Sequence, residues 1–213
     1  MQVSIVGDTC LCVNRFCYDD ASFPLFCPII MKICVFCASS PLAPAEYGQA
    51  AYDLGRIFGQ AGVTTIFGGG GVGSMGRLAD GVHSVNGNIV GVMPHFMREL
   101  EWAHKEVGTF HWTADMAERK ALLRDQTDAI VALPGGCGTF EEVLEVITLK
   151  RLGLYPKPII VLNQNNFYEH LIALFERSIA ERFMEPRHQS LFTVVNTIAE
   201  VLPAAQTVPH WQN

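Results

Sequence analysis

Short apolar runs alternate with amphipathic stretches along the chain from residue 31 onward. Apolar runs of roughly four to eight residues predict buried strands, whereas apolar positions three or four residues apart predict helices. The predicted strands cover residues 33–36, 63–67, 89–92, 109–112, 129–133, 159–162 and 193–195. The predicted helices cover residues 43–61, 73–85, 114–125, 139–152, 166–182 and 197–204. This alternation predicts an α/β fold, a Rossmann-like doubly wound sheet that is mainly parallel and has helices on both faces.

The pattern begins only after residues 1–31, which contain four cysteines and two prolines but show no helical or strand period. This stretch lacks the basic start and the uninterrupted apolar centre of a signal peptide. We therefore treat residues 1–31 as an N-terminal extension of unknown role. Residues 32–213 are enough for one good core and few for two, which predicts a single nucleotide-binding domain.

Composition and charge narrow the class of protein. Hydrophobic residues make up 49% of the chain and charged residues 17%, which suits central strands that are buried on both faces. The formal net charge is −6 and the chain has no block of basic residues, so we expect no nucleic-acid partner. No apolar stretch reaches the roughly 18 residues that a membrane helix needs. We expect a cytoplasmic protein without a membrane partner.

The seven cysteines are odd in number and have no regular spacing, which argues against a secreted disulfide framework. Cys34-x-x-Cys37 has the spacing of some metal and redox sites. No second pair of cysteines or histidines stands at a matching distance, so we expect no metal site.

Glycine-rich segments follow two of the predicted strands and lead directly into helices. One runs from Gly68 to Gly76, and the other runs from Pro134 to Thr139. Glycine lets the backbone approach a ligand closely, and the unpaired N–H groups at a helix start attract anions. In a parallel sheet, ligands gather at the carboxyl ends of the strands, where Ser39 also lies. Two such loops favour phosphate binding over simple tight turns.

The first glycine segment also matches the dinucleotide-binding fingerprint, as Gly71-x-Gly73-x-x-Gly76. That fingerprint needs an acidic residue at the end of the next strand, and this strand ends in Met93-Pro94-His95 without a carboxylate. A Walker loop is absent too, because no Gly-Lys-Ser/Thr follows either glycine segment. A dinucleotide-dependent oxidoreductase therefore stays only as an alternative.

The segment from Pro134 to Glu142 combines candidate phosphate-binding residues with two carboxylates. Its small residues would form a phosphate cradle: Gly135, Gly136, Gly138 and Thr139. Thr139 is also expected to cap the helix that follows, which would put both glutamates in the first turn. Glu141 is expected to complement the helix dipole. A carboxylate beside a phosphate cradle is unusual unless a ribose or an arginine lies between them, so Glu142 is the candidate for chemistry.

A second charged group, from Asp115 to Lys120, precedes the strand that leads to this cradle. Arg119 and Lys120 are adjacent, so a helix points them in different directions. Composition leaves two interpretations open, a solvated helix of mixed charge or a cation that joins the site.

These segments resemble those of a known family. Pro134-Gly-Gly-Cys-Gly-Thr-Phe-Glu-Glu142 resembles the motif PGGxGTxxE of the LOG ("lonely guy") phosphoribohydrolases, and Asp115-Met-Ala-Glu-Arg-Lys120 resembles their DMxxRK segment. The first predicted strand with its loop and the first glycine segment are also similar to theirs. The similarity runs from about Lys32 to the C-terminal helix. It departs at Gly68 and Cys137, and neither departure removes a hydrogen-bond donor or a carboxylate.

The resemblance implies an N-glycosidase that hydrolyses cytokinin riboside 5′-monophosphates, and AMP, to free base and ribose 5-phosphate with no cofactor and no metal. It implies that Glu142 stabilises the oxocarbenium-like ribose and orients water, and that Arg119 stabilises the leaving purine or holds phosphate and carboxylate in place. The residues implied to bind the nucleoside 5′-monophosphate are Glu101, Lys120, Gly135, Gly136, Gly138, Thr139, Thr148, Ser39, Gly70 and Gly71.

The resemblance also implies a homodimer, for which Val143, Ile147 and Leu152 are either interface or core positions. A non-catalytic nucleotide sensor is a second alternative, because it would keep the phosphate loops without turnover. Some relatives carry the label lysine decarboxylase, an activity that needs a lysine to form a Schiff base with pyridoxal phosphate. The lysines of the chain lie in settings that do not favour this role: Lys32, Lys105, Lys120, Lys150 and Lys157.

Overall fold

The computed structural model describes residues 30–98 and 103–212, and before them the strands of a small N-terminal sheet. The chain divides into two compact units, Met1–Ile30 and Met31–Asn213. The first unit contains a four-stranded antiparallel sheet, in the order β1 (Ser4–Ile5), β2 (Leu11–Val13), β3 (Phe16–Tyr18) and β4 (Pro24–Leu25). Each of these strands has two or three residues, which is too short to produce a visible period in the sequence.

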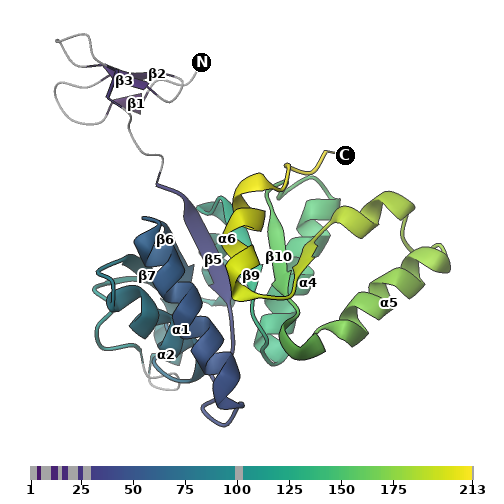
Figure 1. The fold of residues 1–213 in the computed structure, drawn as a ribbon, viewed down its shortest axis with the longest axis horizontal. Coiled ribbons are helices and arrows are strands. Elements are labelled where there is room, and N and C mark those ends of the chain that lie inside the picture. Colours follow the sequence, from purple (N-terminus) through teal and green to yellow (C-terminus); the bar gives the residue numbers. More distant parts are fainter. Residues whose placement is uncertain are drawn as a thin grey trace. The chain divides into compact units, whose positions relative to one another are not determined.

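A seven-stranded parallel sheet forms the centre of the second unit (Figure 1). Its order is β11-β10-β9-β5-β6-β7-β8, and every neighbouring pair is parallel. The strands are β5 (Lys32–Phe36), β6 (Thr64–Phe67), β7 (Asn88–Pro94), β8 (Thr109–Thr113), β9 (Ala129–Ala132), β10 (Ile159–Leu162) and β11 (Thr193–Val195). The predicted α/β fold is confirmed, and each predicted strand agrees with an observed one to within two residues at either end.

Helices connect these strands and cover both faces of the sheet (Figure 1). They are α1 (Ala45–Gln60), α2 (Gly73–His83), α3 (Met116–Asp125), α4 (Cys137–Arg151), α5 (Glu169–Ala180) and α6 (Ile198–Thr207), with short 3₁₀ turns η1 (His95–Met97), η2 (Gln164–Asn166) and η3 (Pro186–Ser190). α5 starts later than predicted because η2 precedes it, and Asn165 in that turn has a left-handed φ of 52°. No helix in the described ranges has the length and hydropathy needed to cross a bilayer.

Alternate residues of the central strand β5 enter two separate hydrophobic cores. Ile33, Val35 and Cys37 belong to the core beside α1, α2 and α6. Cys34 and Phe36 belong to the core beside α3, α4 and α5. Burial on both faces explains the continuous apolar runs of the sequence. The same alternation puts Cys34 and Cys37 on opposite faces of the sheet, so these two thiols cannot hold one metal ion together.

Helices α1 and α2 approach each other more closely than larger side chains would allow. A Cβ atom on Gly55 would lie 2.3 Å from the carbonyl oxygen of Leu78. A Cβ atom on Gly81 would lie 2.1 Å from the carbonyl oxygen of Tyr52. Glycine at both positions therefore lets the two backbones come into contact. We call this contact, formed by Gly55 and Gly81, the glycine seam.

The order of the strands reverses at the centre of the sheet, between β5 and β9. From β5 the chain passes through β6, β7 and β8 to one edge, and it then returns to β9 on the other side of β5. The connections that leave β5 and β9 therefore diverge. The crevice between them is the usual position for a ligand in an open α/β sheet.

The glycine seam predicts different responses to alanine at two positions of α1. Gly55→Ala should lower the free energy of unfolding by about 2–3 kcal/mol, because the added methyl group meets backbone atoms. Gly48→Ala should be neutral or stabilising by up to about 1 kcal/mol, because its Cβ would lie 3.4 Å from the flexible Arg77 side chain. Urea denaturation of both variants measures the difference. Equal stability of the two variants would contradict the close contact of the helices.

Candidate active site

A cavity of about 220 Å³ opens at the crevice between the connections that leave β5 and β9. The connection after β5 contributes residues 37–40, and the start of α4 contributes residues 136–139. Further lining residues come from α3, α4, the end of β6 and the start of α2: Arg119, Glu142, Gly68 and Met75. We call this space the Glu142 cavity.

The first backbone N–H groups of α4 border the Glu142 cavity, and the described residues give them no backbone acceptor. The helix begins at Cys137 with Gly136 as its N-cap, and no side chain caps it. Within the described residues, Phe140 has the first amide of the helix with a backbone acceptor, which is Gly136 O at 3.0 Å. The amides of residues 137–139 are therefore available to an anion. The prediction that Thr139 caps the helix is wrong, because Gly136 takes that position and Thr139 is the third helical residue.

The early start of α4 also moves both glutamates out of its first turn, which contains no acidic residue. The predicted first-turn position of Glu141 and Glu142 is therefore wrong. Glu142 lines the cavity and its side chain is only 13% exposed. The side chain of Glu141 is 53% exposed and lies 2.6 Å from Lys120. The two carboxylates separate because adjacent residues of a helix point about 100° apart.

Arg119 is held in a buried position by backbone carbonyl groups. Its Nε donates to Val92 O at 3.2 Å, and its Nη2 donates to Gly68 O at 3.2 Å. Its Nη1 lies 3.9 Å from Glu142 Oε1, and only 8% of the side chain is exposed. A Cβ atom on Gly68 would lie 2.4 Å from Arg119 Nη2, so glycine leaves room for the guanidinium. Of the two interpretations left open by the sequence, the structure supports a cation at the site.

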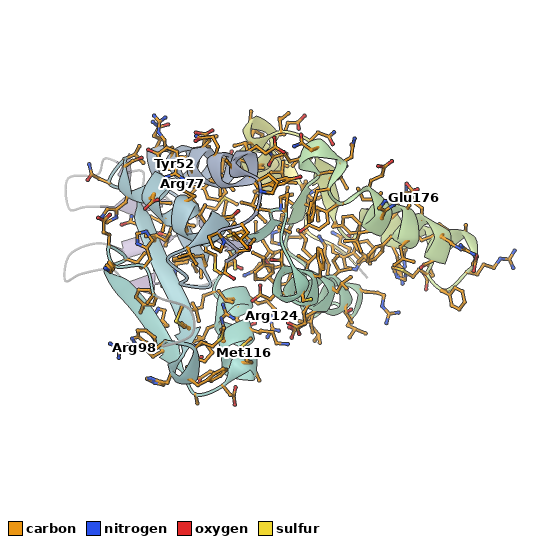
Figure 2. The ribbon with its side chains drawn as sticks, turned by 90° about the horizontal axis from the view of Figure 1, so that it is seen from below. Tyr52, Arg77, Arg98, Met116, Arg124 and Glu176 are labelled. Carbon is orange, nitrogen blue, oxygen red and sulfur yellow. The ribbon has the colours of Figure 1, made fainter. Side chains whose placement is uncertain are left out.

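The N-terminus of α3 fixes the direction in which Arg119 points. The Asp115 carboxylate accepts a hydrogen bond from Glu118 N at 2.9 Å, and the Glu118 carboxylate accepts one from Ala114 N at 2.7 Å. These reciprocal bonds satisfy amides that the helix start would otherwise leave unpaired. Met116, which is labelled in Figure 2, brings its sulfur to 3.9 Å from Arg119 Nη1.

Lys120 faces a different set of carboxylates and does not line the Glu142 cavity. Its Nζ lies 2.6 Å from Glu141 and 2.9 Å from Glu145. Hydrogen bonds with Glu141 and Glu145 raise the pKa of Lys120, so the amine stays charged at neutral pH. Arg124, labelled on α3 in Figure 2, lies 3.8 Å from the same Glu145 carboxylate. The adjacent residues Arg119 and Lys120 thus have different environments. Arg119 lines the cavity, and Lys120 belongs to a partly exposed cluster of ion pairs.

Two buried thiols belong to the surroundings of Glu142. Burial raises the pKa of both Cys34 and Cys37, and the charge of Glu142 raises both further. Cys37 lines the cavity. Both thiols stay protonated at neutral pH, which leaves them poor nucleophiles and poor metal ligands.

The remaining residues expected at the site divide into those at the cavity and those away from it. The first group lines the cavity: Ser39, Gly136, Gly138 and Thr139. Gly135 leaves room for the Thr139 side chain, because a Cβ atom on Gly135 would lie 2.2 Å from Thr139 Oγ1.

The second group is not brought to the Glu142 cavity. Thr148 is exposed on α4, and its hydroxyl donates to Leu144 O at 2.8 Å. Gly70 forms an isolated bridge with Ala103, and Gly71 borders a neighbouring cavity. Glu101 lies outside the described residues.

Cys37 and Met75 are among the lining residues that sequence reasoning missed. Cys37 directly follows β5, so the strand-end rule that selected Ser39 also covers it. Met75 is a buried apolar residue of α2, and its type and position in the sequence give no signal of a site.

Comparisons with known proteins identify the family of the chain. Residues 75–205 match the family described as possible lysine decarboxylase. The chain is 36% identical over 171 residues to the cytokinin riboside 5′-monophosphate phosphoribohydrolase LOG3 of Arabidopsis thaliana, covering 80% of each chain. It is 36% identical over 181 residues to the cytokinin riboside 5′-monophosphate phosphoribohydrolase of Rhodococcoides fascians, covering 84% of this chain and 91% of the relative.

Solved structures with this fold include two proteins of lower identity. The molybdenum cofactor carrier protein of Chlamydomonas reinhardtii has a TM-score of 0.65 and 20% identity, covering 84% of this chain and 97% of that chain. The molybdenum cofactor binding protein of Rippkaea orientalis has a TM-score of 0.65 and 19% identity, covering 84% of this chain and 96% of that chain. These similarities show the fold alone. On the evidence of the closer relatives and of the motif residues at the crevice, the chain belongs to the LOG family of cytokinin riboside 5′-monophosphate phosphoribohydrolases.

Proposed function

We propose that this protein is an enzyme that hydrolyses the N-glycosidic bond of cytokinin riboside 5′-monophosphates, with AMP as a further substrate. The products are the free base and ribose 5-phosphate. One observation carries the proposal: Glu142 and the buried Arg119 share a single cavity with the uncapped start of α4. The names of the relatives support the same reaction.

The 5′-phosphate would bind at the start of α4, where Gly136 and Gly138 have no role in packing. A Cβ atom on Gly136 or on Gly138 would meet nothing within 4 Å. The φ of Gly136 is −97°, which any residue can adopt. The fold therefore does not require glycine at these positions. A ligand that must approach the backbone closely explains why glycine occurs there. The Thr139 hydroxyl, in a residue that is only 4% exposed, adds a donor beside the amides.

Glu142 would act on the ribose that this phosphate positions. In the reaction, water adds to the anomeric carbon while the bond to the base nitrogen breaks, and the base leaves with the electron pair and takes up a proton. The ribose becomes cationic in the transition state, and a carboxylate with little exposure to water stabilises that charge strongly. The same carboxylate can orient the attacking water and accept its proton.

Arg119 would act as a fixed positive charge beside this carboxylate. Its two hydrogen bonds to backbone carbonyls hold the guanidinium in place without using Nη1, which faces Glu142. A guanidinium fixed in this way can orient the carboxylate and stabilise negative charge on phosphate or on the leaving base. Its positive charge in the same cavity also offsets the repulsion between the phosphate and the Glu142 carboxylate.

The alternatives have less support from the residues. Lysine decarboxylation needs a lysine at the site, and no lysine is among the described residues that line the Glu142 cavity. A dinucleotide-dependent oxidoreductase would need a carboxylate at the end of β7, which ends at Pro94. A nucleotide sensor would bind AMP without releasing adenine, which the assays below distinguish.

We also infer that the protein acts as a homodimer in the cytoplasm. Of the α4 positions considered for an interface, Val143 and Ile147 are buried in the core, whereas Leu152 is 54% exposed. Phe140 and Leu144 of the same helix are 39% and 41% exposed. These apolar side chains support a contact with a second copy, which sedimentation equilibrium tests. The free cysteines of the domain suit a reducing compartment.

Glu142→Gln should lower kcat for base release from AMP and from its N6-prenylated form by about a hundredfold or more. The amide keeps the shape of the side chain but removes the negative charge that stabilises the ribose cation. Nucleotide affinity, measured by titration calorimetry, should change much less than kcat. Glu141→Gln is the matched control, because this neighbouring carboxylate points away from the cavity. Wild-type turnover in Glu142→Gln would reject Glu142 as a catalytic residue.

Gly138→Ala should keep the wild-type melting temperature and raise KM for AMP at least about tenfold, because the new methyl group occupies the place of the phosphate. Gly108→Ala is the matched control, since a Cβ atom on Gly108 also meets nothing within 4 Å but Gly108 does not line the cavity. Adenosine lacks the phosphate, so its slow hydrolysis should be equal in wild type and in Gly138→Ala. An unchanged KM for AMP would place the phosphate elsewhere.

A further inference from the structure

A second cavity, of about 300 Å³, lies at the start of α2 and is not used by the proposed reaction. It is lined by the connection after β5, the start of α1 and the first turns of α2. The backbone of Ser39 and Ser40 packs directly against Gly73, whose Cβ would lie 2.6 Å from Ser39 C. This contact stands between the two cavities, since Ser39 lines only the Glu142 cavity and Ser40 lines both. We call the second space the Ser74 cavity.

The start of α2 is left open in the same way as the start of α4. Val72 is its N-cap and provides no side-chain hydrogen bond, and the first turn contains no acidic residue. Met75 N donates to Ala38 O at 3.0 Å and Gly76 N donates to Val72 O at 3.2 Å. Within the described part of the chain, the amides of residues 73 and 74 have no such acceptor. Two donors at the positive end of an 11-residue helix are thus available.

The side chain of Ser74 gives an independent indication of a ligand. Ser74 is 97% buried, as only 3% of its surface is exposed, and it lines the cavity. No hydrogen bond joins its hydroxyl to any described residue, and this oxygen is not among the fully buried unpaired atoms, so it is open to the cavity. A bound acceptor would satisfy this hydroxyl and the two free amides together. The arrangement parallels that of Thr139 at the start of α4, where a buried hydroxyl also accompanies free amides.

A cation stands one turn further along α2. Arg77 lies over the ring of Tyr52, with its Cζ 4.5 Å from the ring centroid, and both residues are labelled together in Figure 2. Arg77 also pairs with Asp80 at 3.3 Å, and His104 lies 3.1 Å from the same carboxylate. Asp80 lines the cavity and would repel an anion, but Arg77 and His104 engage its oxygens. The side chain of Arg77 is 44% exposed and borders the cavity, so its positive charge attracts an anion there while it stays paired with Asp80.

We propose that the Ser74 cavity is a second anion site, which binds a phosphate group through the amides of residues 73 and 74, the Ser74 hydroxyl and Arg77. The ligand is either inorganic phosphate or the second phosphate of a nucleotide that carries two. This site is separate from the cradle at α4 and does not depend on the proposed reaction, which uses one phosphate.

Equilibrium dialysis of the full chain against radiolabelled inorganic phosphate tests the proposal. Wild type should bind two phosphates, and saturating AMP should displace only the one at α4. In the presence of saturating AMP, Ser74→Ala should lower the affinity for the remaining phosphate about tenfold, which is the scale of a lost hydrogen bond to a charged group. Arg77→Gln should also lower the affinity for this phosphate. Arg56→Gln removes an exposed charge from the neighbouring α1 and should leave that affinity unchanged. Tungstate soaked into crystals should give a second anomalous peak beside Ser74.

A competitor then separates the two sources of the phosphate group. If one molecule of adenosine 3′,5′-bisphosphate displaces both phosphates, the ligand is a nucleotide with two phosphate groups. If it displaces only one, the ligand is inorganic phosphate. A wild-type stoichiometry of one, or displacement of both phosphates by AMP, would overturn the proposal, and so would unchanged binding in both Ser74→Ala and Arg77→Gln. Because the assay measures binding, its result is independent of whether the enzyme releases adenine.

Discussion

The buried guanidinium of Arg119 is the contact on which the rest of the site depends. It joins four separate parts of the fold, because α3 supplies the side chain while β7, the end of β6 and α4 supply its partners Val92, Gly68 and Glu142. A charge taken out of water is costly unless partners surround it, and breaking such a cluster leaves the others unsatisfied. The cluster is therefore a constraint on geometry more than a source of stability. It fixes Glu142, whose helix follows β9, relative to β6 and β7 on the other side of the crevice.

Around this cluster the chain repeatedly leaves backbone groups unpaired. The connections after β6 and β9 are rich in glycine and lead into helices that no side chain caps. The two connections use glycine for different reasons. Gly73 and Gly76 allow close backbone contacts at the start of α2, whereas Gly136 and Gly138 touch nothing and leave space at the start of α4. Glycine at a helix start therefore does not by itself identify a ligand site, and the surroundings of each Cβ position are needed to decide.

Most of the fold could be predicted from the sequence, because strands buried on both faces give continuous apolar runs and helices on a sheet give a strong period. The first residue of α4 could not be predicted from the sequence. Thr139 is a good N-cap by residue type, and only the backbone conformation shows that Gly136 is the N-cap. Both glutamates were misplaced for that reason. Composition alone left open whether a cation of α3 joins the site, because this depends on how α3 packs against the sheet, and only the family resemblance selected Arg119. Thr148 illustrates a further limit, since a motif match fixes position in the chain but not the direction of a side chain.

The glycine seam between α1 and α2 has a consequence beyond packing. Both helices begin at the edge of the Ser74 cavity, so the distance between their axes sets the width of that opening. A bulkier residue at Gly55 or Gly81, far from any ligand, would push the helices apart and move the donors of α2 away from Ser40. Selection for ligand binding would then act on interior positions that touch no ligand. Substitutions at the seam would change which anions bind before they destabilise the protein enough to unfold it.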